Sequence, residues 1–258
     1  MKDLDDSRAP LLDHLIELRR RLLYCVGMLL ASFAVCMYFA DDIFGILVRP
    51  LAEAFGPGQG RLVYTKLYEA FFVEVKVALF AAFMLAFPVI ANQIWLFVAP
   101  GLYRNEKRAF LPFLLATPVL FAMGASLAYF VVMPTAFHFF LGFQGNAGGL
   151  AQEALPAMGD YLSLVMHFIL AFGIAFLLPV LLMLMERAGL VTRGQLVAGR
   201  RYAIVAAFIV AAILTPPDVV SQLMLAIPLI VLYELSLIGI WFTERRRADA
   251  SGLGAEGS

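Results

Sequence analysis

The stretch HLIELRRRLLYCVGMLLASFAVCMYFA, residues 14–40, decides the fold class because a basic cluster runs directly into a long apolar block. Residues 22–40 contain no charged side chain. As a helix they would be about 28 Å long, close to the thickness of a bilayer core. Asp41 and Asp42 follow, rather than the small residues of a signal-peptide cleavage site. We therefore expect residues 22–40 to be a retained transmembrane helix.

The composition of the whole chain agrees with this assignment. Of the 258 residues, 62% are hydrophobic and 15% are charged, and the mean hydropathy is +0.88. Soluble domains are closer to half apolar and a quarter charged. The formal net charge of zero argues against a nucleic-acid-binding protein, which would carry a basic surface.

The apolar residues fall into blocks that predict an all-α membrane protein with six transmembrane helices. Pro216 and Pro217 divide the last apolar tract, because proline cannot donate a backbone hydrogen bond and disfavours continued helix. The fifth span is then only about 21 Å long, shorter than a ~30 Å hydrocarbon core. The expected spans are residues 22–40, 70–98, 111–134, 159–185, 202–215 and 220–242.

The distribution of Lys and Arg predicts the orientation of these spans. With the N-terminus inside, 15 of the 19 basic residues lie on the inner side, and Arg49, Arg61, Lys66 and Lys76 remain for the outer side and the start of the second span. Because cytoplasmic loops are rich in Lys and Arg, we expect both termini to be cytoplasmic, in a bacterial inner membrane. The resulting organisation is a basic amphipathic N-terminal segment, a membrane domain and a tail expected to be disordered: residues 1–21, 22–242 and 243–258.

The sequence lacks the motifs of common catalytic sites. It contains no phosphate-binding loop, no HExxH, no GxSxG and no Cys/His spacing typical of a metal site. No cofactor, metal or enzymatic activity is therefore expected. Cys25 and Cys36 lie about 16 Å apart along one helix, which is too far for a disulfide, so both are expected to be small buried apolar residues.

Two glutamates at the inner face have two interpretations. Glu17 stands before Arg19, Arg20 and Arg21, and Glu106 stands in the inner loop APGLYRNEKRAF. Glu17 could simply pair with Arg21 one helical turn later, and Glu106 could be a solvated loop charge. Alternatively, both could present carboxylates to a cationic ligand, since a carboxylate accepts two parallel hydrogen bonds from one guanidinium.

Four segments in order resemble the TatC family, the multispanning core subunit of the twin-arginine protein translocase. The resemblance extends over residues 10–245 and includes the predicted topology. Its motifs are HLIELRRRLL before the first span, FVAPGLYRNEKR after the second, AYFVVMPTAF ending the third and LTPPDVVSQLMLAIP joining the last two.

The resemblance implies a receptor for signal peptides that carry two arginines. Such receptors assemble with single-span amphipathic-helix subunits of the TatA and TatB type to move folded proteins across the membrane. The family's recognition carboxylates match Glu17 and Glu106. The resemblance also implies signal-peptide contacts at Arg19, Phe97 and Tyr103, and partner-contact or structural roles at Pro50, Pro100, Pro217, Asp218 and Gln222.

Several of these residues also have simpler explanations. Phe97, Pro100 and Tyr103 could be interfacial packing residues. Asp218 could cap the sixth helix, and Gln222 could bond to a neighbouring helix. Glu69, Glu74 and Lys76 open the second span, where long side chains can reach water at the outer interface.

The chain departs from the family pattern in the fourth span. Leu177 stands where many relatives carry an acidic or polar residue, and Asn105 stands where many have histidine. His167 lies ten residues before Leu177, about 15 Å along a helix, and is either buried and hydrogen-bonded or a polar group in a concave, lumen-facing surface.

A charge within a span is costly, so Glu234 should face protein or a wet cavity. Glu234 and His167 also support the alternative of an ion-coupled secondary transporter. An intramembrane enzyme is a second alternative, disfavoured by the missing catalytic motifs.

Overall fold

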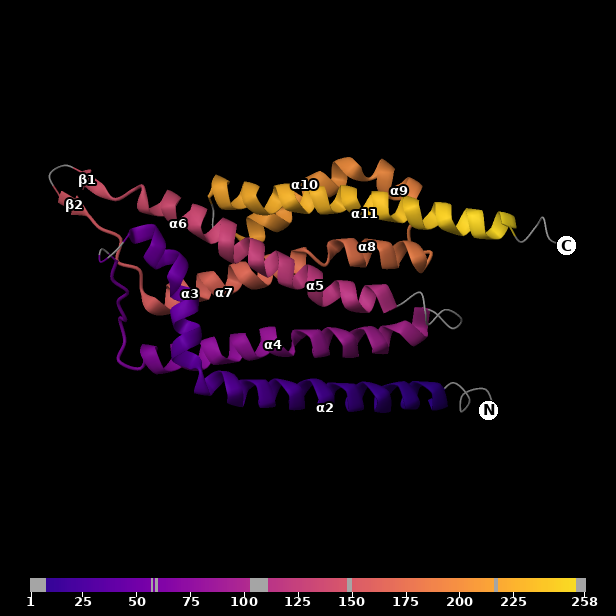
Figure 1. The fold of residues 1–258 in the computed structure, drawn as a ribbon, viewed down its shortest axis with the longest axis horizontal. Helices are drawn as coiled ribbons and strands as arrows, with labels where there is room; N and C mark the ends of the chain where they lie inside the picture. The colour runs from indigo at the N-terminus through magenta and orange to yellow at the C-terminus, as the bar shows by residue number, and fades with distance from the viewer. Residues whose placement is uncertain are drawn as a thin grey trace. The chain divides into compact units, whose positions relative to one another are not determined.

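The computed structural model describes residues 8–56, 58, 60–102, 111–147, 150–215 and 218–253, which are almost entirely helical (Figure 1). Two compact units are present. Met1–Arg49, Arg61–Pro118 and Leu155–Ser163 form the first, and Pro50–Gly60, Val119–Ala154 and Leu164–Ser258 form the second. The all-α class is confirmed, with one small addition: a hairpin of β1 (Gly145–Ala147) and β2 (Leu150–Gln152) in a region predicted to be loop.

The first unit is built on two long helices that lie side by side and run in opposite directions (Figure 1). Helix α2 (Arg8–Tyr38) carries the basic segment and the first span without a break at residues 21–22. Helix α4 (Glu69–Leu102) forms the second span. Buried Cys36 packs against Ala78 and Ala82, which are fully buried. Small residues at these positions let the two backbones approach closely, as is typical of membrane helices.

The segment between the first two spans contains a helix that the sequence did not predict. Helix α3 (Ala40–Phe55) includes Pro50 and lies between the expected spans 22–40 and 70–98, where no helix was predicted. Asp41 and Asp42 occupy the first turn of α3, where carboxylates interact favourably with the helix dipole. They therefore start a second helix instead of ending the ordered segment. Buried Leu47 faces inward, and its carbonyl accepts a hydrogen bond from the Tyr161 hydroxyl at 2.8 Å.

Glu69 joins the extended segment before α4 to the start of α7 (Met158–Ala175). Its Oε2 accepts bonds from the Thr65 amide (2.8 Å), the Thr65 hydroxyl (3.1 Å) and the Lys66 amide (3.3 Å). Its Oε1 accepts a bond from the Gly159 amide at 2.8 Å, which satisfies one of the free N–H groups at the start of α7. Val63 forms a parallel β-bridge with Ala157. The Val63 amide donates to the Pro156 carbonyl at 3.2 Å, and the Val63 carbonyl accepts a bond from the Met158 amide at 2.8 Å.

The third and fourth spans are interrupted near prolines. The third consists of α5 (Leu111–Leu127), the π-helical segment η2 (Ala128–Val132) and α6 (Met133–Leu141), which extends past the predicted end at residue 134. Pro134 cannot donate to the carbonyl four residues back, and the π-turn precedes it. The fourth span is α7 followed by α8 (Leu178–Arg187), with Pro179 in the first turn of α8. Leu177 lies in the turn between them.

The second unit contains α9 (Arg193–Ala198), α10 (Arg200–Leu214) and α11 (Val219–Leu253). A capping box of Thr192 and Gln195 starts α9. Helix α11 packs against α8, α9 and α10, with Leu196, Leu237 and Ile240 in the buried cluster. Residues 243–253 belong to the tail that was expected to be disordered, and they are helical instead. The segment ERRRADA is rich in good helix formers, which continue the helix from the span.

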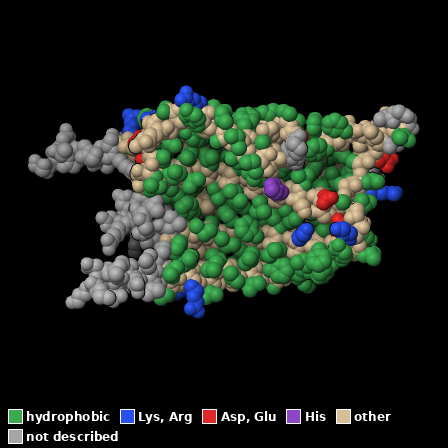
Figure 2. All heavy atoms as spheres, turned by 180° about the vertical axis from the view of Figure 1, so that it is seen from behind, with side chains coloured by type: hydrophobic (Ala, Val, Ile, Leu, Met, Phe, Trp, Pro, Cys, Tyr) green, Lys and Arg blue, Asp and Glu red, His purple; other side chains and the backbone are tan. Residues whose placement is uncertain are grey.

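The lengths and surfaces of these helices are those of a membrane protein. Within the described residues, five segments are long and apolar enough to cross a bilayer: Leu15–Tyr38, Glu69–Phe97, Phe113–Leu141, Met158–Arg187 and Val219–Arg245. Helix α10, the predicted fifth span, has 15 residues and is shorter than these. Figure 2 shows one face of the molecule, on which hydrophobic side chains cover most of the surface. Such a surface requires a hydrocarbon solvent.

Close helix packing in the second unit generates a prediction at Gly124 of α5. A Cβ at Gly124 would meet the Phe172 carbonyl and lie 2.8 Å from the Phe176 ring. We expect Gly124→Ala to destabilise the protein by about 1–3 kcal/mol because the backbones of α5 and α7 must move apart. The measurement is thermal unfolding in detergent. The control is Gly27→Ala in α2, where nothing lies within 4 Å of the new methyl group and helix propensity favours alanine. Equal unfolding temperatures for the two variants would contradict this packing argument.

Candidate functional site

Glu17 lies on α2 within a three-residue cluster that joins α2 to α4. One turn later, Arg21 donates hydrogen bonds from Nε (3.0 Å) and Nη2 to Glu17 Oε1. The same guanidinium donates from Nη1 to Gln93 Oε1 on α4 at 3.2 Å. The Arg21 side chain is 20% exposed and that of Glu17 is 37% exposed, so the carboxylate still reaches solvent. The predicted pairing of Glu17 with Arg21 is confirmed, and it is part of the α2–α4 contact.

The Glu17 carboxylate retains capacity to bind a second cation. Both bonds from Arg21 end on Oε1, and no residue in the described part of the chain donates to Oε2. An ionised carboxylate has about four acceptor positions. The pair with Arg21 therefore orients Glu17 without saturating it.

The end of α4 lies beside this cluster. Because α2 and α4 are antiparallel, Phe97, one turn after Gln93, lies toward the N-terminal part of α2 (Figure 1). Phe97 is half-buried, and Pro100 lies in the last turns of α4. Trp95 Nε1 donates to Thr117 Oγ1 on α5 at 2.8 Å, which fixes this end of α4 to a third helix. Two predicted site residues, Tyr103 and Glu106, lie outside the described residues.

Arg19 does not join the cluster. It is exposed and stands two residues after Glu17, which is about 200° around the helix. The neighbouring Arg20 lies over the Tyr24 ring, 5.8 Å from its centroid. The structure therefore separates Arg19 and Arg20, on the outer side of α2, from Arg21, which faces α4.

The predicted intramembrane polar residues have different environments from those expected. The prediction that His167 is buried and hydrogen-bonded is wrong, because His167 is exposed on α7 and has no hydrogen-bond partner among the described residues. Its neighbours Val165, Phe168 and Ile169 take the buried positions of this helix. Glu234 accepts a bond from Arg200 Nη2 at 2.9 Å, so this charge has a partner on α10, in a pair whose side chains are 42% and 50% exposed. Within the described chain, no hydrogen bond or ion pair joins Glu234 to His167.

The turn between α10 and α11 confirms two of the simpler explanations. Asp218 Oδ1 accepts a bond from the Ser221 amide at 2.7 Å and caps α11. Gln222 Nε2 donates to the Phe208 carbonyl of α10 at 3.3 Å. Pro217 lies outside the described residues.

Sequence reasoning missed Gln93 and Tyr233. Gln93 was detectable as a polar residue inside an apolar span, where it would need a partner from another helix. The Tyr233 hydroxyl donates to the Leu196 carbonyl at 2.7 Å, which ties α11 to α9 beside the Arg200–Glu234 pair. The described residues contain no group of three or more His, Cys, Asp or Glu side chains that could hold a metal. Cys25 and Cys36 are both free thiols, as predicted, and only Cys36 is fully buried.

The cap at Asp218 generates a prediction that separates a structural role from a partner contact. We expect Asp218→Ala to destabilise the protein by about 1 kcal/mol, because the first turn of α11 loses its acceptor. Asp218→Asn is the matched control, since asparagine caps equally well but carries no charge. Thermal unfolding of the two variants makes the comparison. If Asp218→Asn is as unstable as Asp218→Ala, the carboxylate charge matters and capping is not the reason.

Comparisons with known proteins agree with this architecture. Residues 13–228 match the family model described as Sec-independent protein translocase protein (TatC). The TatC protein of Magnetococcus marinus is 52% identical over 95% of this chain and 88% of its own length. That of Escherichia coli K12 is 39% identical over 92% of this chain and 89% of its own.

A solved structure gives the same result. The crystal structure of a twin-arginine translocase receptor, TatC, in DDM has a TM-score of 0.74 and 41% identity, and covers 87% of this chain and 98% of that one. TatC proteins are components of a protein translocase, which is a transport system and not an enzyme. The chain therefore belongs to the TatC family of Sec-independent protein translocase proteins.

Proposed function

We propose that this chain is the receptor subunit of a twin-arginine translocase, and that it binds the arginine pair of signal peptides with Glu17 and Glu106. The observation that supports this proposal most directly is the contact between Glu17 and Arg21. A guanidinium already occupies one oxygen of the Glu17 carboxylate, at a partly exposed position. The site therefore accepts the chemical group that a signal-peptide arginine would bring.

The pair with Arg21 also explains how Glu17 could select arginine. Arg21 restrains the carboxylate from one side and is itself held by Gln93. An incoming guanidinium would approach the second oxygen with its planar set of donors, which suits a carboxylate of fixed orientation. A lysine would offer a compact point charge without that planar geometry, so we expect weaker binding.

Two guanidiniums require a second carboxylate, and Glu106 is the candidate. Glu106 follows the last residue of α4, Leu102, by four positions in the sequence. Helix α4 runs antiparallel to α2, and Gln93 near its C-terminal end accepts a hydrogen bond from Arg21, so the described part of α4 ends near the N-terminal part of α2. Phe97 and Tyr103 would contact the peptide between the two carboxylates.

The apolar part of a signal peptide could follow α2. Three leucines on this helix near Glu17 are exposed: Leu15 (58%), Leu18 (41%) and Leu22 (59%). They form a continuous apolar stripe at helical spacing, next to the carboxylate. A peptide with two arginines followed by apolar residues would match this order of charge and apolar surface.

The membrane arrangement that we propose has six spans, with both termini on the cytoplasmic side of a bacterial inner membrane. Helix α10 is the fifth span in this arrangement, and its 15 residues correspond to about 22 Å. A helix of this length would favour local thinning of the bilayer. Single-span TatA/TatB-type subunits could then pack beside α10 and α11, where the membrane is easiest to disrupt.

The first prediction of this proposal concerns selectivity for arginine. In lipid nanodiscs, the purified protein should bind a fluorescent Arg-Arg signal peptide more tightly than its Lys-Lys counterpart. The double variant Glu17→Gln, Glu106→Gln should bind both peptides equally weakly, with about tenfold or greater loss for Arg-Arg, because charged hydrogen bonds contribute roughly 1.5–3 kcal/mol each. Fluorescence anisotropy measures both affinities.

The control variant is Glu153→Gln, an exposed carboxylate just after β2 that should leave both affinities unchanged. Loss of Arg-Arg binding in this control as well would indicate a general charge effect. Undiminished Arg-Arg preference in the double variant would refute the assignment of Glu17 and Glu106.

A further inference from the structure

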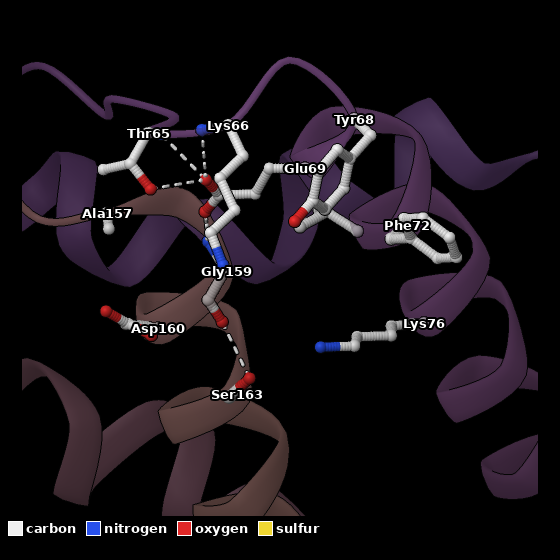
Figure 3. A pocket seen from close by; sticks show the side chains of 11 residues that line it. Thr65, Lys66, Tyr68, Glu69, Phe72, Lys76, Ala157, Gly159, Asp160 and Ser163 are labelled. Atoms are coloured by element: carbon white, nitrogen blue, oxygen red, sulfur yellow. Dashed lines mark hydrogen bonds between the residues drawn. The ribbon is translucent and has the colours of Figure 1, made fainter.

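A second site lies in the first unit, at the opposite end of α4 from Phe97. A pocket of about 510 Å³ opens between the start of α4, the segment before it and the start of α7 (Figure 3). Its walls combine apolar and charged side chains. The residues that the argument uses are Lys66, Tyr68, Phe72, Lys76, Asp160 and Ser163.

Lys76 is the residue that requires an explanation. It lies in the span Glu69–Phe97, seven residues after Glu69 and therefore about 10 Å along the helix from its start. Among the described residues, no carboxylate lies within ion-pairing distance of its ammonium group. An unpaired charge within a span is costly and normally has a partner or reaches water.

The Lys76 side chain points into the pocket. Side chains on a helix lean toward its N-terminus, which for α4 is the end at the membrane interface. Figure 3 shows the ammonium group extending from α4 toward Gly159 and Ser163 on α7. Lys76 therefore presents its ammonium group to the pocket, and its side chain remains exposed.

Neither of the two carboxylates in the pocket, Glu69 and Asp160, forms an ion pair with Lys76. Both oxygens of Glu69 are engaged, accepting bonds from Thr65, Lys66 and Gly159. The Asp160 carboxylate does not point toward the Lys76 ammonium in Figure 3. Lys76 therefore has no direct carboxylate partner in the pocket.

The remaining wall is apolar and aromatic. Val73 is 3% exposed and closes the pocket, while Phe72 (52%) and Tyr68 (59%) stand at its edge with their rings in edge-to-face contact at 5.9 Å. Lys66 Nζ lies 5.9 Å from the Tyr68 ring centroid. Aromatic side chains beside lysines are typical of residues at the level of lipid headgroups.

We propose that this pocket binds a phospholipid, with the headgroup phosphate at Lys76 and an acyl chain against Phe72. A phosphate supplies the missing anion, and Lys66 at the mouth of the pocket adds a second cation. The apolar wall favours a lipid over soluble phosphate, which would gain nothing from Phe72. The proposal does not depend on the signal-peptide site, which lies at the other end of α4.

Native mass spectrometry of the full-length protein tests the proposal. The probes are phosphatidylglycerol, diacylglycerol, which lacks the phosphate, and inorganic phosphate. We expect the wild type to retain phosphatidylglycerol but not diacylglycerol, and Lys76→Gln to retain about fivefold less, the effect of one lysine near an anionic lipid surface. Lys76→Arg should restore retention. Arg61→Gln is the matched control, because Arg61 is an exposed cation of the same segment that does not line the pocket.

Each alternative result has a defined meaning. Equal retention of phosphatidylglycerol by the wild type and Lys76→Gln, with both variants monodisperse and equally helical by circular dichroism, would overturn the site. Equal loss in Arg61→Gln would overturn it in favour of a non-specific charge effect. Binding of inorganic phosphate that depends on Lys76 and competes with the lipid would replace the lipid with a soluble anion.

Discussion

Hydrocarbon offers no hydrogen-bond partner, and the structure is organised around that constraint. Backbone groups are satisfied within helices, and charged side chains in or near the spans need a partner of their own. Arg21 meets this requirement by bonding to Glu17 on its own helix and to Gln93 on α4. The same three side chains hold α2 against α4 and orient the carboxylate proposed to receive a signal peptide.

Three charges show three solutions to the same constraint. Glu17 is paired but open on one oxygen, which leaves room for a ligand. Glu234 is paired with Arg200 across two helices, next to the bond from Tyr233 to Leu196, and this cluster ties α9, α10 and α11 together. Lys76 has no protein partner in the described chain. These differences decide which charges serve packing and which remain able to bind another molecule.

Interruptions in the helices follow from particular residues. Pro134 and Pro179 each follow a change in helical geometry, because a proline removes a backbone donor. Gly124 and Gly173 lie where α5 and α7 approach so closely that a Cβ would meet Phe172 or Phe121. The third and fourth spans are therefore divided into helical segments with joints beside Pro134 and Pro179, whereas α2, α4 and α11 run without a break.

The sequence by itself determined the membrane class and the approximate positions of the five long apolar spans, and it offered the pairing of Glu17 with Arg21 as one of two interpretations. These depend on local properties: apolar blocks of sufficient length and contacts one helical turn apart. The cap at Asp218 was also predictable, since it too is local.

Tertiary structure alone decided which face of a helix meets a neighbour. Nothing in the local sequence indicates that Gln93 receives Arg21 or that His167 is exposed while Phe168 is buried. Helix α3 was not predicted because its sequence contains charged residues and Pro50. The burial of Leu47 depends on a distant residue, Tyr161, whose hydroxyl bonds to the Leu47 carbonyl. In helices that are apolar on nearly all sides, hydrophobic periodicity cannot distinguish a lipid-facing side chain from a buried one. The packing of one helix against another decides which side chains are buried.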